Sequence, residues 1–272
     1  MITEIHVSSV EELVPLLSDQ AYRPGLKRNR SNYVYRGMPN VNYKMVTTLR
    51  RNCKGLERVL EPAILKNFAK YAVIEDPSVA NSVWRQMILG QHHGLPTRLL
   101  DWTHSALVAL HFATSEENLE AMEAHDGVIW RIDIDELHTL LPEKYQAIMR
   151  ANKAEVFSVD MLTQASADLT GYDEDMGDHA MVVLEPPSIN QRIVNQYAFF
   201  TVMPLGMDDL EAFLDKYTEH TLKYVIDRRL RWRIRDMLDA LNMSERSVYP
   251  GLDGLSKWIA RHYFVKDETA GM

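Results

Sequence analysis

Hydrophobic positions recur along the chain with two periods, and each period predicts a different kind of element. Apolar residues three or four positions apart predict helices at 9–17, 56–72, 79–92, 105–118, 208–218 and 228–241. Short alternating or β-branched runs predict strands at 2–6, 32–36, 127–134, 180–184, 192–202 and 223–226, with 95–100 extended. Because the two types mix without a regular strand–helix–strand rhythm, we predict an α+β fold of mainly antiparallel small sheets flanked by helices.

Local signals predict where several of these elements begin and end. Ser9–Glu12 has the spacing of a capping box, which suits the start of the first helix. Gly94 suits a left-handed cap after the helix at 79–92, and Pro96 prevents that helix from continuing. Asp101 or Thr103 is expected to cap the helix that follows.

Two polar segments are predicted to be loops. One is basic and contains Lys27, Arg28 and Arg30. The other, 168–178, is acidic and lacks the residue order of a calcium-binding loop. We therefore expect the acidic segment to be a mobile surface loop.

Composition narrows the class of protein. The chain has 272 residues, is 46% hydrophobic and has a formal net charge of −8, which argues against non-specific coating of nucleic acid or anionic membrane. The single cysteine, Cys53, excludes an internal disulfide. The N-terminus lacks a signal-peptide pattern, and no apolar run reaches the roughly 18 residues of a bilayer span. We expect a cytoplasmic protein folded as a single domain, without repeats or linkers.

The most unusual polar segment is Gln91–Thr103, which places two histidines, a glycine, a proline, an arginine and an aspartate between two apolar helices. So many polar groups beside buried helices cost free energy unless they pair or face a site. Arg98 and Asp101 are three positions apart and have a simpler explanation, a pair with each other. Arg36 ends a predicted strand and offers a planar fork for phosphate or carboxylate, and Gly37 lets a ligand or backbone approach.

Several stretches resemble the FRG domain, a family named for a Phe-Arg-Gly motif. They are Tyr35–Gly37, Gln91–Thr103, Ala109–Ala113, 192–200 and 249–255. Tyr35 replaces the phenylalanine of the motif. The resemblance implies one FRG-type domain over residues 1–272, with its core at 30–263. It implies no particular reaction by itself.

The order of elements is also similar, more weakly, to that of ADP-ribosyltransferase folds. That resemblance implies an arginine at the end of a first strand, a Ser- or Thr-containing strand followed by a helix, and a glutamate on a late strand. Arg36 matches the first position, Thr97 or Thr103 the second, and Gln196 the third. Gln196 departs from the pattern because an amide has no negative charge.

Two functions follow from these resemblances. In the first, the protein is an ADP-ribosyltransferase or NAD hydrolase, and the missing charge comes from Glu185 or Asp101. The catalytic candidates are Arg36, His93, Asp101 and Gln196, and the substrate-binding candidates are Tyr35, Gly37, Gln91, His92, Thr97, Arg98 and Thr103. In the second, the protein binds a nucleotide or a nucleic acid without turnover. NAD is the implied substrate only of the first.

The nucleic-acid alternative depends on a basic helix. Five arginines lie within residues 228–235, and Arg228, Arg231 and Arg235 share one helical stripe beside Trp232. Such a stripe can bind phosphates while the indole stacks on a base. The simpler interpretation is a solvated helix face that pairs with the protein's own carboxylates.

A metal site is not predicted. The candidate ligands are His92, His93, Asp101, His104 and His111. Their spacing matches no compact zinc motif. A histidine that acts as a general base near neutral pH fits this segment better.

Overall fold

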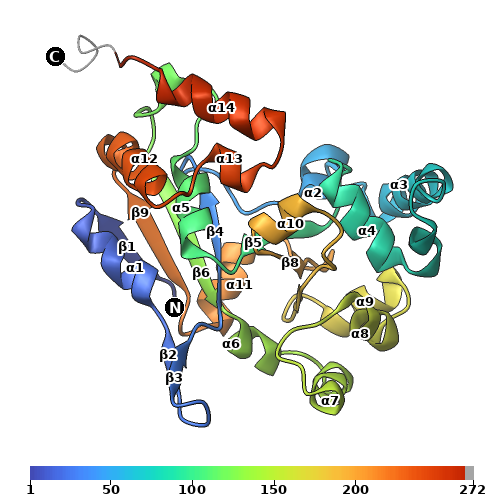
Figure 1. Ribbon diagram of the computed structural model, residues 1–272. Helices are drawn as coiled ribbons and strands as arrows, with labels where there is room; N and C mark the ends of the chain where they lie inside the picture. Colours follow the sequence, from blue (N-terminus) through green and yellow to red (C-terminus); the bar gives the residue numbers. More distant parts are fainter. Residues whose placement is uncertain (267–272) are drawn as a thin grey trace.

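The computed structural model describes residues 1–266, which form a twisted central sheet with helices on both sides (Figure 1). The seven strands of the sheet lie in the order β1-β9-β6-β4-β5-β8-β7, and β2 and β3 form a separate two-stranded ribbon. The strands are β1 Thr3–Val7, β2 Ala21–Arg23, β3 Arg28–Arg30, β4 Tyr33–Met38, β5 Leu99–Thr103, β6 Gly127–Asp133, β7 Val182–Leu184, β8 Ala198–Val202 and β9 Leu222–Ile226.

The helices gather in groups around this sheet (Figure 1). The α-helices are α1 Val14–Ser18, α2 Thr48–Cys53, α3 Glu57–Ala72, α4 Val83–His92, α5 Ala106–Thr114, α6 Ile134–Thr139, α7 Glu143–Asn152, α8 Val159–Ala165, α9 Leu169–Met176, α10 Gln191–Asn195, α11 Leu210–Tyr217, α12 Arg231–Ala240, α13 Glu245–Val248 and α14 Leu252–His262. Short 3-10 turns are η1 Glu11–Leu13, η2 Pro77–Asn81, η3 Leu119–Ala121 and η4 Arg228–Leu230.

The pairing of strands confirms the predicted mixed fold with a mainly antiparallel sheet. Within the described residues, β1 and β9 pair in parallel, and the other neighbouring strands of the sheet pair antiparallel. Most strands join one large sheet instead of several small ones. This arrangement brings Arg36 on β4 beside the Gln91–Thr103 segment, which ends in β5.

Alternating side chains of the central strands divide the core between the two faces of the sheet. On β6, Ile129 packs in a cluster with residues of α5 and α12, whereas Val128 and Trp130 pack in a second cluster with residues of α11. This period of two is the expected consequence of the pleat. A third cluster joins α4 and the helices α7–α9 to β7 and β8.

Gly37 lies where β4 meets α5. A Cβ atom at position 37 would overlap the Ala109 carbonyl oxygen and lie 2.7 Å from the backbone nitrogen of Ala113. Neither backbone atom can move without shifting the helix. The close approach explains a glycine at this position.

We predict that Gly37→Ala destabilises the protein by about 3 kcal/mol, the upper end of the usual cost of overpacking. Urea unfolding followed by circular dichroism measures this change. Gly25→Ala is the matched control, because a Cβ there meets nothing within 4 Å. Equal stability of the two variants would contradict the packing argument.

The strands β4 and β5 diverge, and this divergence opens the sheet. They pair only at Tyr35 and Thr103, whereas β4 and β6 stay in register from Tyr33 to Met38. Beyond that pair, NH1 of Arg36 donates to the main-chain carbonyl of Asp101.

Two predicted segments, 168–178 and 192–202, contain different elements in the structure. Segment 168–178 is largely helix α9 and not a loop, because Asp168 caps it and Tyr172 and Met176 are buried one turn apart. Segment 192–202 contains α10 before β8, so β7 and β8 pair with each other but are joined through a helix.

The start of the next helix also differs from the prediction. Asp101 and Thr103 lie in strand β5, and Ser105 caps α5 with its side chain. The helix ends at Thr114, earlier than the predicted residue 118. The basic segment near Lys27 is the turn of the β2–β3 ribbon, so Arg28 and Arg30 lie in a short strand.

Helix α3 occurs where the sequence predicts it, but a different face is buried. Val59 and Tyr71 are exposed, whereas Glu61 and Leu65 are buried. The reason is an ion pair, because Glu61 reaches the buried guanidinium of Arg98.

Within the described part of the chain, no helix is both long and apolar enough to cross a bilayer.

Candidate functional site

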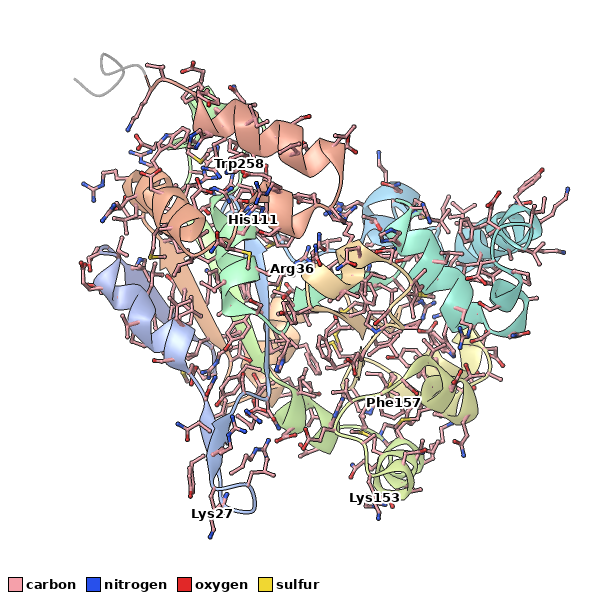
Figure 2. The ribbon with its side chains drawn as sticks, in the orientation of Figure 1. Lys27, Arg36, His111, Lys153, Phe157 and Trp258 are labelled. Atoms are coloured by element: carbon pink, nitrogen blue, oxygen red, sulfur yellow. The ribbon has the colours of Figure 1, made fainter. Side chains whose placement is uncertain are left out.

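A pocket of about 310 Å³ lies where β4 and β5 diverge, and Arg36 lies near the centre of the molecule beside it (Figure 2). Strand β4, the end of α4, strand β5, helix α5, helix α10 and strand β8 all contribute to it. The lining residues are Tyr35, Arg36, Gly37, Gln91, His92, Asp101, Trp102, Thr103, Phe112, Arg192, Ile193, Gln196, Ala198 and Phe200. Eight of the eleven predicted catalytic and substrate-binding residues are among them; His93, Thr97 and Arg98 are not.

Arg36 has unused hydrogen-bonding capacity in this pocket. Its NH1 group donates to the Asp101 main-chain carbonyl at 2.6 Å, and its buried Nε has no partner among the described residues. The side chain is 19% exposed. Burial lowers the pKa of Arg36, the Asp101 charge opposes this shift, and the guanidinium stays cationic at neutral pH. An anion that enters the pocket meets a desolvated cation.

Asp101 supplies the pocket's negative charge. Among the described lining residues its carboxylate is the single acidic group. One oxygen lies 3.9 Å from NH1 of Arg36, and the Gln91 amide donates to both oxygens at 3.1 and 3.2 Å. The side chain is 60% exposed, so the carboxylate is oriented by Gln91 but still accessible to a ligand.

Gln91 is itself held in one orientation. Its Oε1 accepts a hydrogen bond from the Thr97 hydroxyl at 2.6 Å, which leaves its amide NH2 to point at Asp101. Thr97 is buried, does not line the pocket and instead orients Gln91. The predicted substrate contact of Thr97 is therefore not supported by its position.

Gln196 is fixed from the opposite wall. Its side-chain NH2 donates to the Val248 carbonyl of α13 at 3.3 Å, which leaves its amide oxygen available to the pocket. Its main-chain carbonyl accepts from the Thr103 hydroxyl at 2.6 Å. Thr103 is thus occupied in joining β5 to α10, although it lines the pocket.

Arg192 is a lining residue that was not predicted. It belongs to α10, and its guanidinium lies 5.3 Å from the centre of the Tyr249 ring. Together Arg36 and Arg192 outnumber Asp101, so the lining favours an anionic ligand. The sequence signal that could have identified Arg192 was its position in the segment 192–200, which resembles the FRG domain, four residues before Gln196.

The two neighbouring histidines differ in position. His92 lines the pocket and its Nε2 lies 2.7 Å from the Asn190 side-chain nitrogen. Burial, His93 and Arg192 lower the pKa of His92, so its ring is neutral at pH 7. His93 is exposed and outside the pocket, which makes it a poor general base for this site.

Arg98 is a structural residue. It is buried with Glu61, and it also pairs with Asp173 of α9 at 2.6 Å. Although burial alone would lower the pKa of Arg98, hydrogen bonds and charges of both carboxylates raise it. The predicted pair with Asp101 is therefore wrong, and because Arg98 does not line the pocket its position does not support the predicted contact with substrate.

The basic stripe predicted for nucleic acid is not on the surface. Arg231 and Arg235 are fully buried, with Arg231 donating to main-chain carbonyls and Arg235 pairing with Glu245. Trp232 stacks on Phe264 with ring centres 5.4 Å apart. Arg228 alone of the stripe is exposed, so the stripe does not present a row of phosphate-binding groups.

His111 on α5 and His104, just before that helix, do not line this pocket. His111 is buried against Arg235, and burial lowers its pKa to about 3. His104 lies at a different, larger cavity. Among residues 1–266, no group of three His, Cys, Asp or Glu side chains is arranged to hold a metal ion.

Part of this site lies in a segment of the chain that matches a family model. The model described as FRG domain matches residues 31–121, so the chain carries an FRG domain in this segment. The matched segment supplies Arg36, Gln91 and Asp101 to the pocket, whereas Arg192 and Gln196 come from later in the chain. No curated protein and no solved structure matches the chain.

Proposed function

We propose that the pocket binds a nucleotide through its phosphates and cleaves the nicotinamide–ribose bond of NAD. The observation that carries this proposal is the buried guanidinium of Arg36, which has an unpartnered Nε and faces a cavity with one accessible carboxylate. Buried polar groups usually have hydrogen-bond partners. Arg131, Arg231 and Arg235 also have a buried Nε without a partner, but of these four arginines only Arg36 lines this pocket. Phosphate oxygens are the acceptors that match an arginine fork.

In this proposal, residues on different walls of the pocket bind different parts of NAD. Arg36 and Arg192 bind the pyrophosphate, and Gln196 offers its amide oxygen to a ribose hydroxyl. Asp101 lies on the neighbouring strand β5, with one carboxylate oxygen 3.9 Å from NH1 of Arg36. In this proposal its carboxylate lies beside C1′ of the ribose whose phosphate Arg36 binds. Glu185, the other candidate for this charge, lines the larger cavity instead.

The reaction is a substitution at the anomeric carbon. The bond between the ribose C1′ and the nicotinamide nitrogen breaks, and its electron pair leaves with nicotinamide, which becomes neutral. The cationic sugar that develops is stabilised by the Asp101 carboxylate. Water or an acceptor nucleophile then bonds to C1′ and loses a proton to solvent.

A second candidate function is nucleotide binding without turnover. The observation in its favour is the position of Gln196, whose amide is anchored to Val248 and offers no negative charge to the ribose. In this alternative Asp101 only orients Gln91 and Arg36. Both functions require a phosphate bound to Arg36, and they differ in whether nicotinamide is released.

Because both proposed functions require a phosphate bound to Arg36, we predict that Arg36→Ala weakens the binding of ADP-ribose by about 10- to 100-fold. This loss is the equivalent of one or two charge-assisted hydrogen bonds. Calorimetric titration of ADP-ribose measures the affinity. Arg58→Ala on the exposed side of α3 is the matched control and should bind as the wild type does. Unchanged affinity in Arg36→Ala would exclude Arg36 as the phosphate anchor.

A further inference from the structure

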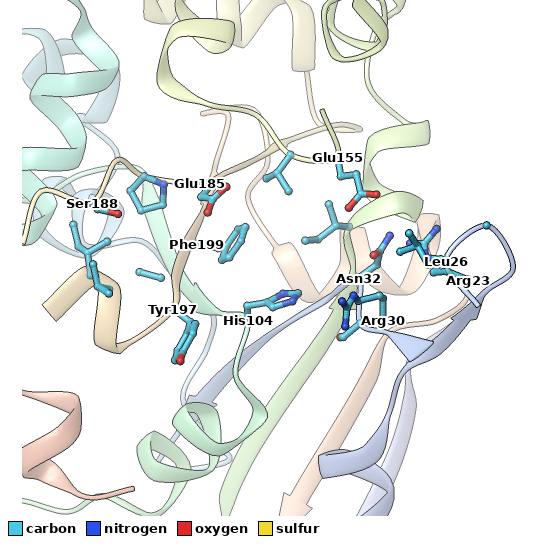
Figure 3. Close-up of a pocket in the computed structure, with 18 of the residues that line it drawn as sticks. Arg23, Leu26, Arg30, Asn32, His104, Glu155, Glu185, Ser188, Tyr197 and Phe199 are labelled. Carbon is cyan, nitrogen blue, oxygen red and sulfur yellow. The ribbon is translucent and has the colours of Figure 1, made fainter. Parts of the chain in front are cut away.

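A larger cavity of about 960 Å³ lies beside the nucleotide pocket, between the β2–β3 ribbon and the ends of β5 and β8 (Figure 3). The two cavities share Ile193 and Ala198 in their linings, so they adjoin across α10 and β8. A volume near 1,000 Å³ is the upper end of the range for small-molecule sites and accommodates several residues of an extended peptide. Nothing in the nucleotide proposal uses this cavity.

One end of the cavity combines a carboxylate with aromatic rings. Glu185, Phe199, Tyr197 and His104 gather there (Figure 3). Glu185 is exposed, and within the described chain no Lys, Arg or His nitrogen lies within 4.0 Å of its carboxylate. The rings of Phe199 and His104 lie 5.7 Å apart and are tilted by 38°. A carboxylate beside aromatic faces is a favourable environment for an organic cation.

The opposite end is formed by the ribbon and carries charges of both signs, because the exposed Glu155 lines the cavity on the same side as Arg23 and Arg30 (Figure 3). Arg23 pairs with Asp135 at 3.1 Å, so its charge is balanced within the protein. Arg30 is exposed and also lines the cavity. A longer chain with peptide N–H and carbonyl groups can pair with charges of either sign and span both ends. The charge distribution therefore suits a peptide more than an isolated cation.

Tyr197 is held at the cavity by an uncommon backbone conformation. Its φ is +47°, in the left-handed region that bulky residues rarely adopt. Its main-chain carbonyl accepts a hydrogen bond from the main-chain N–H of His104 at 3.0 Å, and the residue is 59% exposed. The fold thus presents a large apolar ring to solvent at the boundary between the two cavities.

We propose that this cavity binds an extended peptide segment through an arginine or lysine side chain, which pairs with Glu185 and lies against Tyr197 and Phe199. The peptide continues toward the ribbon, where Arg30 meets its carbonyl or carboxylate oxygens. This site is independent of nucleotide binding. If the neighbouring pocket cleaves NAD, a peptide held here lies beside it as an acceptor.

The test uses a fluorescent nonapeptide of glycine and alanine with one central arginine, and a matched peptide in which citrulline replaces the arginine. Fluorescence polarisation with the full chain should show that the arginine peptide binds at least about tenfold more tightly, because citrulline has the same shape but no charge. Equal binding of the two peptides, or no binding of either at millimolar concentration, would overturn the proposal.

Variants locate the site on the protein. Glu185→Gln should weaken binding of the arginine peptide about tenfold, and Glu174→Gln, an exposed glutamate on α9 outside the cavity, should not. Tyr197→Asn removes the ring but tolerates the left-handed backbone, and should weaken binding roughly two- to fivefold. Equal losses in Glu185→Gln and Glu174→Gln would indicate general attraction to an acidic protein and contradict the proposal.

Arg36→Ala separates this inference from the proposed function. The variant lacks the phosphate anchor and should bind the arginine peptide as the wild type does. Melting temperatures of all variants check that each is folded. If the wild-type protein binds the peptide but not ADP-ribose, the peptide site is supported and the nucleotide site is rejected. If it binds ADP-ribose but not the peptide, the nucleotide site is supported and the peptide site is rejected.

Discussion

Arg98→Met is expected to lower the free energy of unfolding by about 3–5 kcal/mol, the usual cost of removing one partner from a buried ion pair. Arg98 and Glu61 are both 2% exposed at their side chains, and Asp173 is 9% exposed. Without the guanidinium, Glu61 keeps a buried charge with no cation to balance it, or it must bind a proton. Methionine fills similar space, so the loss measures charge and not volume.

Urea unfolding followed by circular dichroism measures this effect. The control is Arg85→Met, which removes an arginine that pairs at 3.3 Å with Asp160 near the surface, where the Asp160 side chain is 84% exposed. Exposed pairs contribute at most about 1 kcal/mol, so this variant should be nearly as stable as the wild type. A loss of less than about 1 kcal/mol in Arg98→Met would mean that Arg98 is not a structural residue.

Asp101→Asn is expected to slow nicotinamide release by roughly 10²–10³-fold, the size reported for loss of one group that stabilises charge in a transition state. The substitution removes the pocket's negative charge but retains an oxygen that can accept from Gln91. Binding of the ground state depends on Arg36, so the affinity for ADP-ribose should stay within a few-fold of wild type. The loss should therefore appear in kcat and not in KM.

Chromatographic detection of nicotinamide over a range of NAD concentrations separates the two parameters. Glu185→Asn serves as the control, because Glu185 was the other acidic candidate and lines the neighbouring cavity. It should release nicotinamide at the wild-type rate. A variant at position 185 that loses turnover while Asp101→Asn retains it would reverse the assignment of the charge.

The sequence predicted the pocket better than it predicted the role of each residue. The density of polar groups in Gln91–Thr103 correctly indicated a cleft, and Arg36, Asp101 and Gln196 converge on it although they are far apart in the chain. Arg98 was misassigned because its partners lie 37 and 75 residues away. Spacing within a segment cannot show which side of a strand each neighbour faces.

Burial of charge explains the other misinterpretations. Arg231 and Arg235 share a helix face with the buried residues Ile234 and Leu238, and the stripe looked like a surface only because arginines are usually exposed. Although burial raises the pKa of Glu245, hydrogen bonds from Arg261 and the charge of Arg235 lower it to about 2. That pairing holds α12 to α13 and depends on contacts that a sequence pattern does not contain.

Some errors were avoidable from the sequence. In 168–178, Tyr172 and Met176 are four positions apart behind an Asp168 cap, a helical signal that the many acidic residues concealed. The division of 192–202 was less accessible. Its strand begins only after Tyr197, whose positive φ turns the chain, and no residue type there predicts that turn.

The most direct test of the NAD proposal is nicotinamide release by the purified wild-type protein, measured by chromatography beside Arg36→Ala and Asp101→Asn. The proposal predicts release by the wild type and its loss in both variants, by failure to bind phosphate in the first and by failure of bond cleavage in the second. Absence of release by the wild type, even with cell lysate added as a source of acceptor, would contradict NAD cleavage.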